Sequence, residues 1–220
     1  MTTDIGKDKC SKMHGGTSAA APNAVGVFAL ALEARCVALC NQVGESLFRY
    51  FSPDLTWRDI QHLCVQTAQV VSPEDPDWEK TAVGRPFSYK YGYGKIDAYN
   101  YVIAAKTWKN VKPQAWIEMP TMQINGGAMN RLKAMSGGDF IVPGGIRSSQ
   151  TLTKAMMERE NFEKLEHITV KVWIQHTKRG DVEVELVSPG GIKSILAATR
   201  RQDAMDTGYP GWTFMTVKHW

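Results

Sequence analysis

The chain has 220 residues, of which 43% are hydrophobic and 22% charged, a composition typical of a globular protein with one large or two small domains. Its net charge is +4, and the basic residues are scattered, with Lys178-Arg179 and Arg200-Arg201 as the longest basic runs. These runs are too short to indicate a nucleic-acid partner, and no uninterrupted apolar run reaches the roughly 18 residues of a membrane span. We therefore expect neither nucleic-acid binding nor a membrane segment in this chain.

The N-terminus and the cysteines give little further direction. The first residues, MTTDIGKD, lack the basic start and the apolar segment of a signal peptide. Cys36 and Cys40 lie four residues apart, but no cluster of histidines or carboxylates accompanies them, so no metal site is expected. Cys64 is expected to behave as a small buried hydrophobic residue.

The segment from His14 to Pro22 combines a glycine pair, two hydroxyl residues and the start of an apolar helix that is predicted to run to about Ala34. The glycines allow a sharp turn and a close approach to another group. Ser18 would lie in the first helical turn, where free N–H groups and the helix dipole favour a developing negative charge. A serine nucleophile needs this geometry, although on spacing alone a simple helix cap is the favoured interpretation.

The residue string is more specific than the spacing. Gly-Thr-Ser-Ala-x-Ala-Pro, followed by Gly26 and an apolar helix, resembles the nucleophile segment of subtilisin-like serine peptidases. The fuller string, HGGTSAAAP and then VGVFALALEA, resembles the kexin branch, the proprotein convertases that cut after paired basic residues. The resemblance implies that Ser18 is the nucleophile. His14 is not expected to be the base, which in the family is a histidine far earlier in the chain, and Cys10 is expected to pair with a cysteine upstream of Met1.

The segment Arg35–Phe51 has no counterpart in the family pattern. Without it the sequence reads EASPDLTWRD, which follows the family pattern without interruption. We interpret the segment as a non-family insertion and, because its seventeen residues match the coding length of a short fungal intron, as translated intron sequence. A lineage-specific surface insertion is the alternative, since loops tolerate added length well.

The following elements are predicted by local patterns. Thr56 with Asp59 three residues later predicts a capped helix that runs to about Thr67, on which His62 is structural. The string YGYGKIDA resembles the segment that closes the subtilisin-like domain, and Asp97 is expected to cap a helix over about residues 98–106. A polar loop is predicted over residues 72–86.

Beyond residue 106 the chain is predicted to cross into a second unit. Residues 121–150 are rich in glycine and read as a loop, and residues 151–166 have helical propensity near Lys154–Glu158. From His167 the apolar residues alternate with polar ones, and turn signals such as Gly190-Gly191 separate short segments, which predicts antiparallel strands. The strands are expected over residues 168–174, 182–186, 192–197 and 212–217.

The order of these strands resembles the P domain, the β-sandwich that follows the peptidase domain in convertases. The overall prediction is an α/β fragment, the C-terminal helices of a subtilisin-like domain in residues 1–106, followed by a jelly-roll-like β-sandwich in residues 107–220, truncated at both ends. Arg179-Gly180-Asp181 is interpreted as a hairpin feature of the P domain, and integrin-type adhesion is its minor interpretation.

By this resemblance the intact protein is a calcium-dependent serine endopeptidase of the late secretory pathway, at the Golgi membrane, which cleaves precursor proteins after Lys-Arg or Arg-Arg. Only Ser18 carries over from the catalytic set. In the family the triad aspartate and histidine, the oxyanion asparagine, the substrate-reading acids and the calcium ligands all lie upstream. The missing N-terminal half of the catalytic domain is therefore an expected partner. A serine without its base loses most of the rate acceleration, so we expect the isolated chain to be inactive.

Two alternatives to this function remain. The first is a stand-alone β-sandwich interaction module formed by residues 107–220. The absence of the last expected strands argues against it, because an unpaired strand edge favours aggregation. The second is a non-functional product of an incomplete gene model, and for the chain by itself this is the favoured description.

Overall fold

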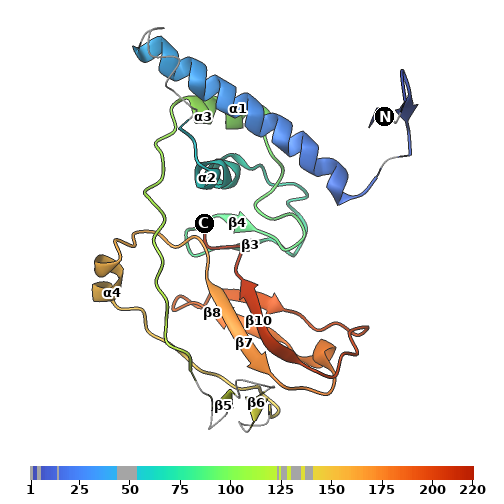
Figure 1. The fold of residues 1–220 in the computed structure, drawn as a ribbon, viewed down its shortest axis with the longest axis vertical. Helices are drawn as coiled ribbons and strands as arrows, with labels where there is room; N and C mark the ends of the chain where they lie inside the picture. Colours follow the sequence, from blue (N-terminus) through green and yellow to red (C-terminus); the bar gives the residue numbers. More distant parts are fainter. Residues whose placement is uncertain are drawn as a thin grey trace. The chain divides into compact units, whose positions relative to one another are not determined.

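The computed structural model describes residues 2–3, 6–13, 15–43, 54–122, 124, 128–129, 135–136 and 141–220. The chain divides into two compact units, one of residues 1–79 and 86–112 and one of residues 80–85 and 113–220. The helices α1 to α3 belong to the first unit, and the strands β7 to β10 belong to the second (Figure 1).

The helical unit is built on α1 (Ala20–Val43), with α3 (Ala98–Lys106) packed along it and α2 (Trp57–Thr67) against α3 (Figure 1). A 3-10 turn over Thr17–Ala19 leads directly into α1. Two short antiparallel strand pairs complete this part of the chain: β1 (Thr2–Thr3) with β2 (Cys10–Ser11), and β3 (Glu79–Lys80) with β4 (Pro86–Phe87).

Helices α2 and α3 begin as their sequences predict. The Thr56 side chain accepts a hydrogen bond from the Asp59 N–H, and the Asp59 carboxylate accepts one from the Thr56 N–H, so the capping box is present. Asp97 caps α3 by accepting a hydrogen bond from the Asn100 N–H. These two caps fix where the chain enters both helices that pack with α1.

The core of the helical unit lies where the three helices meet. Ala31, Leu63 and Tyr101 have no exposed surface, and the rings of Phe28 and Tyr101 lie 5.6 Å apart. The apolar residues of α1 in this core recur at helical spacing and form its inward face. The partly buried residues around this core are Val27, Phe28, Leu32, Ile60, Cys64, Val102, Ala104 and Trp108.

Helix α1 ends at Val43, and the predicted end near Ala34 was wrong. That prediction placed the end where the family pattern breaks, but residues 35–43 contain no glycine or proline to stop a helix, and the first glycine after Ala34 is Gly44. Arg35 is only 9% exposed, and its guanidinium forms two hydrogen bonds of 2.9 and 3.0 Å with the carboxylate of Asp54. The first residue of the predicted insertion is therefore part of the helical unit. Its residues 44–51 lie outside the described ranges.

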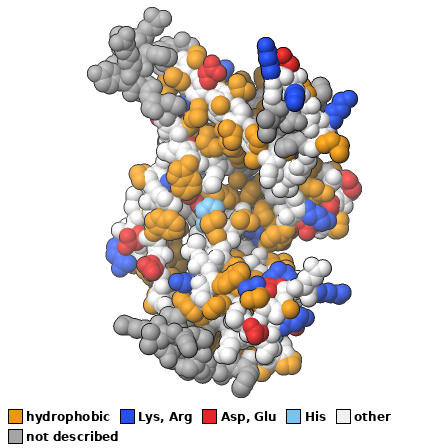
Figure 2. Space-filling model, turned by 45° about the vertical axis from the view of Figure 1, so that its right-hand side comes forward, with side chains coloured by type: hydrophobic (Ala, Val, Ile, Leu, Met, Phe, Trp, Pro, Cys, Tyr) orange, Lys and Arg blue, Asp and Glu red, His pale blue; other side chains and the backbone are white. Residues whose placement is uncertain are grey.

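Helix α1 also bears on the expectation of no membrane segment. The stretch Thr17–Leu39 is long and apolar enough to cross a membrane by length and composition, although charged residues interrupt it. Its inner face packs in the core through Ala31 and pairs Arg35 with Asp54, as in a helix of a folded domain. Hydrophobic side chains nonetheless gather at the surface of the helical unit (Figure 2). Exposed examples on α1 are Val25, Leu30 and Val37.

The second unit contains two antiparallel strand pairs that share a core. Strand β7 (Thr169–Ile174) pairs with β10 (Tyr209–Met215), and β8 (Val184–Val187) pairs with β9 (Lys193–Ala197). The residues Val182, Ala197 and Tyr209 are buried together, so the period-two prediction of strands is confirmed. The described residues show small antiparallel sheets rather than a complete sandwich. Further short elements are α4 (Lys154–Arg159), β5 (Ala128–Met129) and β6 (Met135–Ser136).

The prediction that Arg179-Gly180-Asp181 belongs to a hairpin was wrong in its topology. These residues form a single 3-10 turn after β7, but β7 pairs with β10 and not with the following strand β8. The hairpin of this unit joins β8 and β9, where the Gly191 N–H donates to the Ser188 carbonyl. The turn therefore connects two different strand pairs.

Candidate functional site

Ser18 lies in the 3-10 turn that opens α1, as the segment from His14 to Pro22 predicts. The residue before the turn is Gly16, with φ 101° and ψ 161°, a backbone conformation that is nearly restricted to glycine. No side chain caps the turn, and the Ala19 N–H donates to the Gly16 carbonyl at 3.1 Å. The simple interpretation of Thr17 and Ser18 as side-chain caps is therefore not what the structure shows.

The side chain of Ser18 is exposed, at the N-terminus of a 24-residue helix. The first N–H groups of such a helix have no partner within the helix, and its dipole favours negative charge there. A developing oxyanion next to Ser18 would be stabilised by this backbone. Among the described residues no group closely approaches the glycine pair as expected, since a Cβ added at Gly15 or Gly16 would meet no atom within 4 Å. The need for glycine comes from φ at Gly16.

The histidines that the structure describes are buried or contact residues other than Ser18. His62 is 2% exposed on α2, in keeping with the structural role predicted for it. The Nδ1 of His167 lies 3.0 Å from the Thr216 carbonyl, and the Nδ1 of His176 lies 2.7 Å from the Lys178 carbonyl. His219 contacts the hydroxyl of Ser194. The rejected base candidate His14 lies outside the described residues.

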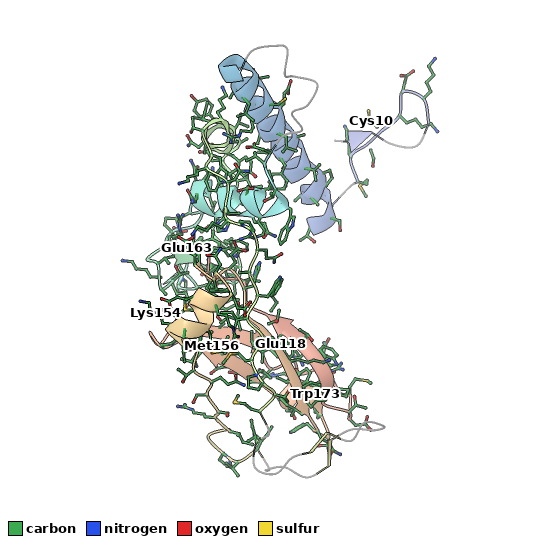
Figure 3. The ribbon with its side chains drawn as sticks, turned by 60° about the vertical axis from the view of Figure 1, so that its left-hand side comes forward. Cys10, Glu118, Lys154, Met156, Glu163 and Trp173 are labelled. Atoms are coloured by element: carbon green, nitrogen blue, oxygen red, sulfur yellow. The ribbon has the colours of Figure 1, made fainter. Side chains whose placement is uncertain are left out.

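The described residues do not offer a metal site. They contain no group of three or more histidine, cysteine, aspartate or glutamate side chains placed to hold an ion. Asp75 binds the ammonium of Lys90 at 2.8 Å, and Asp77 accepts a hydrogen bond from the Ser88 hydroxyl at 2.6 Å. Cys10 is exposed on β2 (Figure 3), and Cys36 is half-buried on α1. This donor set does not fit the calcium that the resemblance implies.

Asp59 joins α2 to the chain segment that follows α3, and sequence reasoning assigned it only the cap. Its side chain is fully buried and accepts hydrogen bonds from the Trp108 indole N–H and the Val111 N–H, each at 2.8 Å. Burial alone would raise the pKa of Asp59, but the hydrogen bonds from Thr56, Val111 and Trp108 together lower the pKa below its ordinary value. The ionised carboxylate is therefore a structural anchor of the helical unit.

The Arg-Gly-Asp turn is held inside its unit. Arg179 binds the carboxylate of Asp203 through Nε at 2.7 Å and Nη2 at 2.8 Å, and its guanidinium lies 4.7 Å from the Trp212 ring centroid. A Cβ at Gly180 would lie 2.0 Å from the Arg200 carbonyl oxygen. An adhesion motif has to present its arginine to a partner, whereas here the guanidinium of Arg179 is bound along its edge by Asp203 and on one face by Trp212. The structure thus favours a structural role for this turn.

Asp203 was missed by the sequence reasoning. It lies three residues after Arg200 and binds that side chain as well as Arg179. The spacing of Arg200 and Asp203 was a visible signal for a local ion pair. The ion pair between Asp203 and Arg179, 24 residues apart, forms only because the fold brings the turn at residues 179–181 next to the loop that contains Asp203.

Comparisons with known proteins assign most of the chain to two families. The family described as the Subtilase family matches residues 2–94, and the family described as the Proprotein convertase P-domain matches residues 165–220. The kexin of Candida albicans is 43% identical over 220 residues, which cover 100% of this chain and 22% of that protein. The dibasic-processing endoprotease of Schizosaccharomyces pombe is 42% identical over 216 residues, 96% of this chain and 27% of that protein.

A solved structure has a related fold. The serine protease of Aeromonas sobria matches with a TM-score of 0.53 and 22% identity, covering 79% of this chain and 32% of that chain. At this identity the likeness concerns the fold alone. The chain spans about a quarter of the length of the curated relatives that it matches.

Proposed function

Because this chain belongs to the kexin-like proprotein convertases of the subtilase family, we propose that it is the segment of a serine endopeptidase that carries the nucleophile helix and part of the P domain. The intact enzyme would cleave precursor proteins after Lys-Arg or Arg-Arg, the specificity that a dibasic-processing relative has in its name. The observation that carries the proposal is Ser18 in a Gly16-initiated turn at the start of α1.

In this proposal Ser18 attacks the carbonyl carbon of the bond after the basic pair, while a base takes the hydroxyl proton. The backbone N–H groups of Thr17 and Ser18, at the start of the turn, stabilise the oxyanion that forms. The triad histidine and aspartate come from the part of the catalytic domain upstream of Met1. Without them the Ser18 hydroxyl keeps its proton, so the 220-residue chain by itself is inactive.

The surface of α1 supports the same arrangement. Only 11% of the most apolar part of this helix is buried, and Val25, Leu30 and Val37 are each more than half exposed. A soluble domain rarely leaves this much of a long apolar helix uncovered. We propose that the upstream half of the catalytic domain covers it, which makes that half the principal partner of this segment.

The finer expectations for the intact protein belong to this proposal. The strand pairs β7–β10 and β8–β9, with the core of Val182, Ala197 and Tyr209 between them, would be completed to a jelly-roll-like sandwich by further strands. Residues 1–106 would belong to the catalytic domain and residues 107–220 to the P domain. Calcium would bind in the upstream half, and the enzyme would work in the late secretory pathway at the Golgi membrane.

The segment Arg35–Phe51 remains part of the proposal as a non-family insertion of translated intron origin. The described part of it continues α1, and its first residue, Arg35, binds Asp54 beside the core. Reads of mature message across these codons test the origin. A message that lacks codons 35–51 is expected, and uniform coverage of them would leave only the surface insertion.

A chimera tests the proposed function. The part of the catalytic domain that precedes the matched segment in the Schizosaccharomyces pombe endoprotease is fused to the N-terminus of this chain. One version of the chimera keeps residues 35–51 of this chain, and a second version lacks them. We expect the chimera without the insertion to hydrolyse a fluorogenic peptide after Lys-Arg, and the matched Ser18→Ala chimera to lose roughly a thousandfold or more of that rate. A folded chimera that cleaves no dibasic peptide, or one that keeps its activity with Ser18→Ala, would contradict the proposal.

A further inference from the structure

The chain contains two sequences of the kind that its proposed relatives cut. Lys178-Arg179 and Arg200-Arg201 are the paired basic residues of this sequence. Arg201 and Gln202 are exposed in a turn, the type of place where peptidases nick folded proteins. Cleavage would hydrolyse the amide bond after the second basic residue, with water supplying the atoms of a new carboxylate and a new ammonium end.

Both basic pairs are anchored by one carboxylate. Asp203 forms two hydrogen bonds with the guanidinium of Arg179, and it also accepts from Nη2 of Arg200 at 3.1 Å. The side chains of Arg179 and Asp203 are 17% and 15% exposed. The guanidinium of Arg200 further binds the Tyr209 hydroxyl. Arg179 is thus largely buried, and Arg200, whose side chain is 39% exposed, is bound by the same carboxylate. Each arginine would have to leave Asp203 before it could enter the acidic pocket of a peptidase.

The backbones of the two pairs are also joined to each other. The Arg200 N–H donates to the Gly180 carbonyl at 2.7 Å, and the Gly180 N–H donates to the Asp203 carbonyl at 2.9 Å. The Arg179 N–H donates to the Met205 carbonyl at 2.7 Å. Gly180 is buried, and it provides the nitrogen of the bond that would be cut after Arg179. A peptidase that binds an extended strand would have to break these hydrogen bonds first.

We propose that the two dibasic pairs are latent processing sites that mask each other in the folded unit, with Asp203 as the shared positioning residue. This inference rests on the proposed function in one respect: it assumes that the peptidase which meets these sites cleaves after paired basic residues. The masking withstands acid, since hydrogen bonding from Arg179, outweighing partial desolvation, holds the pKa of Asp203 at about 2. Cleavage would require local opening of the contact between residues 178–181 and 200–205.

The test uses a supplied peptidase and the full chain carrying Ser18→Ala, so that self-cleavage cannot contribute. The chain and its Asp203→Asn variant are incubated with the dibasic-processing endoprotease of Schizosaccharomyces pombe, and the fragments are identified by mass spectrometry. We expect cuts after Arg179 and Arg201 to be about tenfold faster or more in Asp203→Asn, the effect of losing one charge-assisted hydrogen bond. Synthetic peptides of residues 174–184 and 196–206 should be cut readily.

Two further variants separate masking from general unfolding. Asp206→Asn removes an exposed carboxylate of the same loop and should leave the chain resistant. Val182→Ala weakens the core of the unit and leaves Asp203 in place. The proposal is overturned if the chain with Asp203 intact is cut as fast as the peptides, or if the peptides are not cut. It is also overturned if Val182→Ala and Asp203→Asn, compared at temperatures equally far below their melting temperatures, are cut at these bonds equally fast. Because the peptidase is supplied, an inactive chimera leaves this result unaffected.

Discussion

Replacing Asp59 tests whether a single buried carboxylate joins the helices of the first unit. Asp59→Ala removes the acceptor for four hydrogen bonds: those from the Thr56 N–H and hydroxyl, at 2.8 and 2.6 Å, and those from the Trp108 indole and Val111 N–H, at 2.8 Å. The capping box is lost, and two donors in a buried site lose their partner. The change leaves the apolar core residues untouched.

The magnitude follows from these contacts. Loss of a capping interaction costs roughly 0.5–2 kcal/mol, and each buried donor left without a partner costs roughly 1–3 kcal/mol. We expect Asp59→Ala to lower the free energy of unfolding by roughly 3–5 kcal/mol, which lowers the melting temperature of a domain of about 100 residues by roughly 15 °C or more. Asp59→Asn keeps an oxygen for Trp108 and Val111 and should cost about half as much.

The assay is urea and thermal unfolding followed by the circular dichroism of the helices. Asp97→Ala serves as the matched control, because it also removes an N-cap aspartate but from a half-buried site, and its effect should be smaller. Because the pKa of Asp59 is lowered in the folded state, its stabilising effect is full above the ordinary pKa near 3.8 and is lost as the pH falls through the folded-state value. A loss of less than about 1 kcal/mol in Asp59→Ala would refute this reasoning.

Two further predictions concern the second unit. Gly180→Ala places a Cβ 2.0 Å from the Arg200 carbonyl oxygen, so the thermal midpoint measured by tryptophan fluorescence should fall, and an unchanged midpoint would show that this contact is not tight. Burial, then the charge of Lys218 and the proximity of His167, lower the pKa of His219 below 6.5, so folding excludes a proton there. Stability should therefore decline as the pH falls below about 6.5, and His219→Gln should remove that part of the decline in pH-dependent urea titrations, whereas identical pH profiles would contradict it.

The local sequence predicted those elements whose ends are set by neighbouring residues. The boundaries of α2 and α3 followed from Thr56, Asp59 and Asp97, because a cap is a contact between residues three apart. The strands β7 to β10 followed from their alternation. The family was predicted from the string around Ser18 and is confirmed by the matches over residues 2–94 and 165–220.

Features that depend on distant contacts were not predictable in this way. The end of α1 was misplaced because the family pattern, and not a helix-stopping residue, marked Ala34. The link from Asp59 to Trp108 and that from Arg179 to Asp203 span 49 and 24 residues. Such pairs arise only once the chain has folded back, and no spacing rule relates their partners. The positive φ of Gly16, by contrast, agrees with the sharp turn that the glycine pair predicts.

We propose that Ser18 is a serine nucleophile whose base is not supplied by these 220 residues. Intact-mass and peptide mapping after treatment with a fluorophosphonate tests it directly, on the purified 220-residue chain and on the chimera that carries an upstream catalytic half. The account predicts no labelling of the isolated chain and stoichiometric labelling of the chimera at Ser18. Stoichiometric labelling of Ser18 in the isolated chain, or labelling of the folded chimera at a different residue, would contradict it.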